Sequence, residues 1–156
     1  MTSGILQGKS IGKIADDLQK RVIDMGRVSA VRAARTAYTS AQNGGRMDSY
    51  KAAEKMGIEV KKEWLATLDE RTRTSHREID GETVTQDAVF SNGLRYPGDP
   101  KGKPAEVYNC RCTLIPVVGG VDTSDRMRRD KTGVFKKMSY PEWENAKRNG
   151  GVAYAG

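Results

Sequence analysis

The sequence predicts an α+β fold: N-terminal amphipathic helices packed on a small β-rich module with a Cys/His cluster, followed by a basic C-terminal arm. Two observations lead to this class. Up to Gly57, apolar residues recur at helical spacing among good helix formers. Beyond Gly57, the segments are short, rich in β-branched and aromatic residues, and separated by stretches of glycine and proline. The predicted divisions are 1–57 for the helical part, 58–118 for the β-rich module and 119–156 for the arm.

Two amphipathic helices are predicted in the helical part. Ser10 is a typical N-cap, and apolar residues then follow at helical spacing up to Gly26, a natural stop. The second helix begins near Ser29 and runs to the end of the helical part. Its interior contains Gly44-Gly45, which costs about 2 kcal/mol relative to alanine. We therefore expect this helix to kink there, to split in two, or to be stabilised by packing.

The β-rich module is expected to alternate strands with turns. IEVKKEWLATL predicts a strand centred on Trp64, followed by a turn, a short helical segment around His76 and a second turn at Gly81. RYPGDPKGKP must be a loop, because it holds three prolines and two glycines in ten residues. The segment AEVYNCRCTLIPVV, residues 105–118, predicts the next strand.

The arm is expected to end in a short helix. Ser139 would cap it, and Pro141 suits its first turn. Trp143 then serves as the anchor that docks this helix on the body.

Charge is distributed unevenly along the chain. The formal net charge is +7, and the two flanks are basic while the middle is slightly acidic. Basic flanks predict salt-sensitive contact with double-stranded DNA, and the alternative is a solvated helix surface. The expected nucleic-acid-binding residues are Lys13, Arg21, Arg32, Arg35 and Arg46.

Nothing in the sequence predicts a membrane association. No apolar run approaches the roughly 18 residues that a membrane-spanning helix needs. The first residues also lack the apolar core of a signal peptide. We therefore expect the protein in a cytosol, where cysteines are typically reduced thiols, metal ligands or reactive groups.

A single arginine separates the only two cysteines, Cys110 and Cys112. If this segment is extended, residues two apart point to the same face, so both sulfurs project together. Two thiolates supply half of a tetrahedral zinc shell, and the only histidine, His76, is the best further ligand. Asp69, Asp80 or a water would complete the shell.

Two alternatives stay open for these cysteines. A Cys/His pair can act as nucleophile and base, although the sequence offers no recognisable orienting residue or oxyanion loop. The cysteines can also be small, semi-buried apolar residues beside a hydrogen-bonded histidine.

A set of motifs along the chain resembles a known family. A helix with ARTAYTSAQN is followed by W-x-A-T-x-D-x-R-T-R-x-x-H at Trp64 to His76, by Asp80-Gly81, by Phe90, by the YPGDP loop and by a closing NCRC. In order and spacing they resemble the Mu F-like minor head proteins of tailed phages, also called head-morphogenesis proteins. The resemblance covers roughly residues 5–116.

The resemblance implies a virion protein present in few copies, with portal, scaffold or capsid proteins and packaged DNA as partners. It implies a role in head assembly and genome delivery, a location in the virion and in the host cytoplasm during assembly, and no established catalytic activity. It also makes zinc held by the histidine and the cysteines a natural inference. The remaining motif positions are expected to be structural: Trp64, Arg71, Asp80, Gly81, Asn109 and Arg111.

The leading interpretation is thus a structural and interaction protein and not an enzyme. One alternative is a phage-encoded enzyme or toxin-like effector, such as a nuclease or a transferase. Only about 40 residues follow NCRC, fewer than a typical effector domain of 50–250 residues needs. The other alternative is a plain DNA-binding protein, which predicts a contiguous basic face on the helices.

Overall fold

The fold was obtained as a computed structural model, which describes all residues except 1, 23–24, 120, 122–126 and 153–156. Helices and strands are mixed along the chain, so the predicted α+β class is confirmed. They occur in the order α1 Thr2–Leu6, α2 Ile11–Arg21, α3 Arg27–Lys55, β1 Val60–Leu65, α4 Thr74–Arg77, β2 Thr83–Val84, α5 Pro104–Val107, β3 Thr113–Val118, β4 Met127–Arg129, β5 Val134–Lys136 and α6 Tyr140–Arg148.

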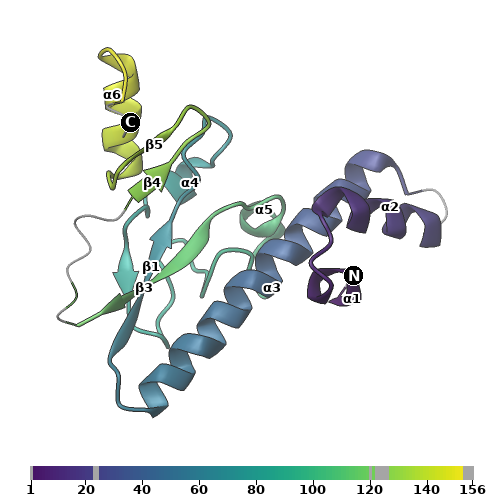
Figure 1. The fold of residues 1–156 in the computed structure, drawn as a ribbon, viewed down its shortest axis with the longest axis horizontal. Coiled ribbons are helices and arrows are strands. Elements are labelled where there is room, and N and C mark those ends of the chain that lie inside the picture. Colours follow the sequence, from purple (N-terminus) through teal and green to yellow (C-terminus); the bar gives the residue numbers. More distant parts are fainter. Residues whose placement is uncertain (1, 23–24, 120, 122–126, 153–156) are drawn as a thin grey trace.

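The helix α3, with 29 residues, is the longest helix in the described part of the chain. Figure 1 shows α1 and α2 at the N-terminal end of α3, and α6 at the opposite end of the molecule. The strands β2, β1 and β3 form an antiparallel sheet in that order, with Trp64 of β1 opposite Leu114 of β3. A separate hairpin pairs β4 with β5.

Helix boundaries follow local capping. Ser10 caps α2 as predicted, because its hydroxyl accepts a hydrogen bond from the Lys13 N–H at 3.3 Å. Gly26 was expected to stop this helix, and that prediction is wrong. The helix α2 ends at Arg21, and Gly26 is the extended residue that precedes α3.

The helix α3 continues through Gly44-Gly45 without a break. Of the three outcomes expected for this pair, packing is therefore the one that occurs. A Cβ atom on Gly44 would lie 3.7 Å from the Tyr96 hydroxyl, an ordinary contact distance, so the Tyr96 ring packs on α3 at this position.

Two apolar clusters hold the described elements together. The smaller one joins α2 to α3 and consists of Ile14, Ala15, Ala30 and Ala34. The larger one is built around Trp64, which is fully buried and makes edge-on ring contacts with His76 and Phe90, both at 5.1 Å between centroids. His76, one of the predicted metal ligands, therefore contacts the main core.

Strand β1 of the three-stranded sheet carries a buried lysine. Lys62 is 0% exposed, and its Nζ donates hydrogen bonds to three backbone carbonyls, those of Gln86, Ala88 and Arg95, at 2.7–2.9 Å. Burial lowers the pKa of Lys62 to about 8. This side chain ties β1 to the irregular segment that follows β2.

The C-terminal residues contribute to the main core. Phe135, Tyr140, Trp143 and Val152 belong to the cluster around Trp64. The structure thus does not show the predicted basic arm, because apolar side chains of β5 and α6 are buried against the body. The divisions 1–57, 58–118 and 119–156 stay a prediction.

The terminal helix begins as predicted. Ser139 and Glu142 form a reciprocal capping box at the start of α6, with Pro141 in the first turn. Trp143 is buried, and its indole N–H donates to the Asp130 carboxylate at 2.8 Å. The predicted anchoring role of Trp143 is confirmed.

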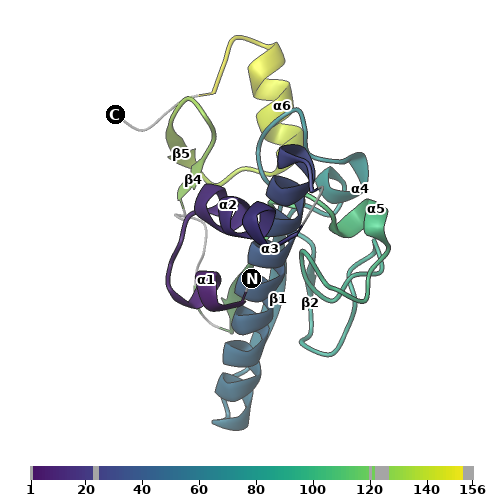
Figure 2. The same ribbon diagram turned by 90° about the vertical axis from the view of Figure 1, so that its right-hand side faces the viewer.

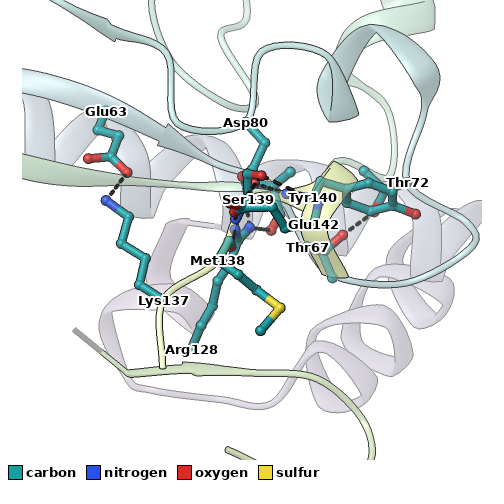
Figure 3. A network of polar contacts seen from close by, with 11 residues as sticks. Glu63, Thr67, Thr72, Asp80, Arg128, Lys137, Met138, Ser139, Tyr140 and Glu142 are labelled. Carbon is teal, nitrogen blue, oxygen red and sulfur yellow. Dashed lines mark hydrogen bonds and ion pairs between the residues drawn. The ribbon is translucent and has the colours of Figure 1, made fainter. Parts of the chain in front are cut away.

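An ion pair inside the protein joins the C-terminal segment to the β-rich module (Figure 3). Asp80 and Arg128 have side chains only 0% and 5% exposed, and form two hydrogen bonds of 2.7 Å. The Asp80 carboxylate also accepts the backbone N–H groups of Ala66 at 2.7 Å and Tyr140 at 2.6 Å. Arg128 donates further to the carbonyls of Ala66 and Met138. Every charge in this pair therefore has several partners, as a buried charge requires.

We predict strong energetic coupling between these two residues. Asp80→Asn and Arg128→Met should each lower the free energy of unfolding by about 3–5 kcal/mol, because each leaves a buried charge without its partner. The double variant should lose less than the sum of the two, which urea denaturation of all four proteins measures. Asp87→Asn, at an exposed carboxylate, is the control and should change stability by about 0.5 kcal/mol or less. Additive losses would contradict the prediction.

Candidate metal centre

His76 and the two cysteines converge in the structure. The three residues are buried, and one ligand atom from each lies within 4.8 Å of the others. The His76 Nδ1 atom is 3.5 Å from the Cys112 sulfur and 3.8 Å from the Cys110 sulfur. Zinc ligands at about 2.0–2.3 Å from the metal stand roughly 3.5–3.8 Å apart at tetrahedral angles, so these nitrogen–sulfur distances fit a shared zinc ion.

The predicted strand over residues 105–118 is wrong in its first half. Residues 104–107 form the helical turn α5, and β3 begins only at Thr113. Asn109 has a φ of 57°, the left-handed conformation that asparagine tolerates better than most residues. The chain turns there, so both cysteines lie in the irregular segment before β3.

Side chains of α3 hold the backbone of this segment. The Thr39 hydroxyl donates to the Cys110 carbonyl at 2.8 Å, and the Asn43 amide donates to the Cys112 carbonyl at 3.3 Å. The Asn43 amide oxygen accepts the Leu114 N–H at 3.0 Å. Arg35 donates to the Asn109 amide oxygen at 3.1 Å. Sequence reasoning missed Thr39 and Asn43, whose signal is polar residues at four-residue spacing along an alanine-rich helix.

Glu106 is a third residue that sequence reasoning missed. Its carboxylate lies 3.0 Å from the His76 Nε2 atom and also accepts the Ser75 hydroxyl at 2.8 Å. When Nε2–H donates to this carboxylate, the lone pair of Nδ1 faces the two sulfurs. A carboxylate on the outer nitrogen is the usual companion of a metal-binding histidine. The only hint in the sequence is an acidic residue four positions before Cys110.

Asp69 was expected as a further ligand, and the structure places it elsewhere. Its carboxylate forms an ion pair with Arg111, including an Nη2–Oδ1 bond of 2.8 Å, and accepts the Arg71 N–H at 2.9 Å. The hydrogen bond from Arg111 lowers the pKa of Asp69. The described metal-binding group thus contains only His76, Cys110 and Cys112.

The two thiols differ in acidity. A hydrogen bond from Cys112 lowers the pKa of Cys110, and the nearby Arg73 and Arg111 guanidiniums favour the thiolate further. The same bond and burial raise the pKa of Cys112 well above its ordinary value. The thiolate of Cys110 is therefore favoured even before a metal ion binds. A set of thiolate and imidazole donors suits zinc.

The remaining motif residues lie outside the Cys/His group. Gly81 has a φ of +86°, a left-handed turn that favours glycine, and its N–H donates to the Trp64 carbonyl at 2.8 Å. The Thr67 hydroxyl donates to the Arg111 carbonyl at 2.8 Å. Arg71 is exposed.

The residues predicted to bind nucleic acid fall into two groups. Lys13, Arg21 and Arg32 are exposed on α2 and α3. Arg35 and Arg46 are partly buried and directed inward, where Arg46 donates to the Thr113 hydroxyl at 2.5 Å.

Several of the motif residues noted in the sequence therefore make the contacts that build this centre. The model of the family described as Phage Mu protein F like protein matches residues 1–115. The chain belongs to the phage Mu protein F-like family. The motif spacing noted in the sequence places His76 and the two cysteines together in the structure.

Two curated relatives extend this assignment. The minor head protein GP7 of Bacillus phage SPP1 is 33% identical over 95% of the chain. The NAD(+)–arginine ADP-ribosyltransferase EFV of Enterococcus faecalis is 34% identical over 90% of the chain. The chain spans 49% and 29% of the length of these relatives. No solved structure matches it.

None of the helices in the described part of the chain combines the length and the apolar character that crossing a bilayer requires.

Proposed function

We propose that this Mu F-like chain is a phage minor head protein module that acts in head morphogenesis and in genome packaging or delivery. It works through contacts with portal, scaffold or capsid proteins and with DNA, in the virion and earlier in the host cytoplasm. The observation that carries the proposal is the match to a minor head protein over 95% of the chain.

A structural role and not catalysis is proposed because three carboxylates in and around the motif are engaged within the protein. Asp80 is bonded to Arg128, Asp69 to Arg111, and Glu106 to His76 and Ser75. A general acid or base needs access to a substrate proton, and these three carboxylates serve internal partners. The relative named as an ADP-ribosyltransferase shares only 29% of its length with this chain.

We further propose zinc as the ion of the Cys/His group. Cys110, Cys112 and His76 would supply two sulfurs and one nitrogen, and Glu106 would fix the tautomer and orientation of the imidazole. A bound ion would join α4 to the segment before β3 next to Trp64, and so add folding free energy. The fourth position belongs to water or to a group from a partner.

Zinc should therefore be a stoichiometric component. Untagged purified protein should carry close to one equivalent of zinc by elemental analysis, and chelation should lower its melting temperature, because an ion bound only by the native state stabilises it. Glu106→Gln should weaken zinc binding about 10–100-fold. Glu78→Gln, at an exposed residue two positions after His76, should bind zinc as the wild type does. Metal-free protein of unchanged melting temperature would contradict the zinc proposal.

The proposed DNA contact is now restricted to exposed cations. Lys13, Arg21 and Arg32 are available, whereas Arg35 and Arg46 hold the cysteine segment. Affinity for double-stranded DNA should be weak, independent of sequence and steeply dependent on salt. Lys13→Glu with Arg21→Glu should reduce both the affinity and the salt slope in fluorescence anisotropy. Arg148→Glu, at an exposed position of α6, is the control. Salt-independent binding, or none at low salt, would remove DNA as a direct partner.

The head-protein proposal is tested in particles. The wild-type chain should co-purify with phage heads in few copies, and particles that lack it should form and package DNA but infect poorly. Infectivity and quantitative protein analysis of purified heads measure both outcomes. Fully infectious particles without the chain would exclude the proposed role.

A further inference from the structure

A groove of about 530 Å³ runs between α3 and the segment 98–108 that leads through α5. In both views α5 lies beside the N-terminal half of α3 (Figures 1 and 2). Small side chains of α3, including Ala33 and Ala37, form one wall, and Pro100, Pro104 and Val107 belong to the other. Its volume is in the range of about 300–1,000 Å³ that is typical of binding pockets.

The wall opposite α3 is held rigidly. Gly98 has a φ of +81°, and a Cβ atom there would lie 2.9 Å from the Ser40 backbone nitrogen of α3. A Cβ atom on Gly102 would lie 2.2 Å from a Leu94 methyl group. Only glycine allows both approaches. The groove is thus preformed, which reduces the ordering cost of binding.

One cation lines the groove, and two more are exposed on the segment that forms its opposite wall. Arg32 lines it and stands 5.9 Å from the centre of the half-exposed Tyr108 ring, while exposed Lys101 and Lys103 alternate with lining residues of the opposite wall. None of these three cations has an ion pair among the described residues.

The carboxylates of the segment do not line the groove. Asp99 is occupied by Arg95, with bonds of 2.6 and 2.7 Å, and Glu106 by His76 and Ser75. The lining residues include no acidic side chain. The groove therefore combines an apolar floor with Arg32, a lining cation that has no ion pair among the described residues.

We infer that this groove docks an acidic amphipathic segment of a protein partner, with apolar side chains on the floor and carboxylates against Arg32, while the exposed Lys101 and Lys103 of the opposite wall segment add positive charge. In such a helix-in-groove contact, the groove binds the apolar stripe of the partner helix. The charges beside the groove then select the partner. The inference rests on the proposed function only in expecting a protein partner. DNA fits poorly, because the floor is apolar, and a second copy of a chain of net charge +7 is a weak electrostatic complement.

The probe is a synthetic helical peptide with leucines at i, i+3, i+4 and i+7 spacing and glutamates at the flanking positions, compared with its lysine counterpart. The glutamate peptide should bind saturably and shift the methyl NMR signals of Ala33, Ala37 and Val107. The lysine peptide should bind about tenfold more weakly or less, because like charges meet at Arg32. Ala37→Trp should abolish binding by filling the groove, while Ala41→Trp, at an exposed residue of α3, should not. Arg32→Glu with Lys103→Glu, exposed residues that leave the fold intact, should reverse the peptide preference.

Several results would overturn the inference. They are no saturable binding of the glutamate peptide, equal binding of both peptides, signal shifts elsewhere, or unchanged binding by Ala37→Trp. Displacement of the peptide by double-stranded DNA, or a dimer that Ala37→Trp dissociates, would give the groove another occupant. In heads, equal incorporation of Ala37→Trp and Ala41→Trp would refute the docking role alone. Absence of the wild-type chain from heads would refute the proposed function, which peptide binding does not test.

Discussion

The structure depends on the contact between α3 and the backbone of the segment before β3. Asn43 is 1% exposed and bonds to the backbone of three separate stretches: Thr39 within the helix, Pro97 in the loop, and Cys112 with Leu114 at the start of β3. An amide has two donors and two acceptor positions, and a buried one must use them. The position of each cysteine is thus set by a helix about 70 residues earlier, as the sequence separations of 71 and 69 residues in these bonds show.

The glycine pair Gly44-Gly45 directly follows Asn43 in α3. Two glycines weaken a helix interior, yet α3 stays intact, with Tyr96 packed against Gly44 and the Asn43 amide bonded to the Pro97 carbonyl of the loop. The same loop then forms one wall of the groove. The loop position and the groove both depend on one close approach, that of Gly98 to the Ser40 backbone.

Much of the fold could be predicted from local signals, and the centre only in part. Ser10, Ser139 and the strand containing Trp64 are local patterns of capping and β propensity, and they were predicted correctly. The position of Cys110 was not, since a run of β-formers hides both the helical turn that starts at Pro104 and the left-handed Asn109. His76 and the cysteines were still grouped correctly, because few other residues in this chain have their ligand chemistry. Glu106 and Asp69 were not separable by residue type, and only tertiary contacts decide that the former bonds to His76 and the latter to Arg111.

Buried charges distinguish the parts of the chain that are fixed from those that are free to bind. Asp80 with Arg128, Asp69 with Arg111 and Lys62 with its three carbonyls are all paired within the body, where an isolated charge would be costly. Arg32 has no ion pair among the described residues and lies instead at the apolar groove between α3 and the segment 98–108. That groove adjoins the Cys/His centre through Glu106 and Val107, so metal binding and docking would act on the two sides of the same turn, α5.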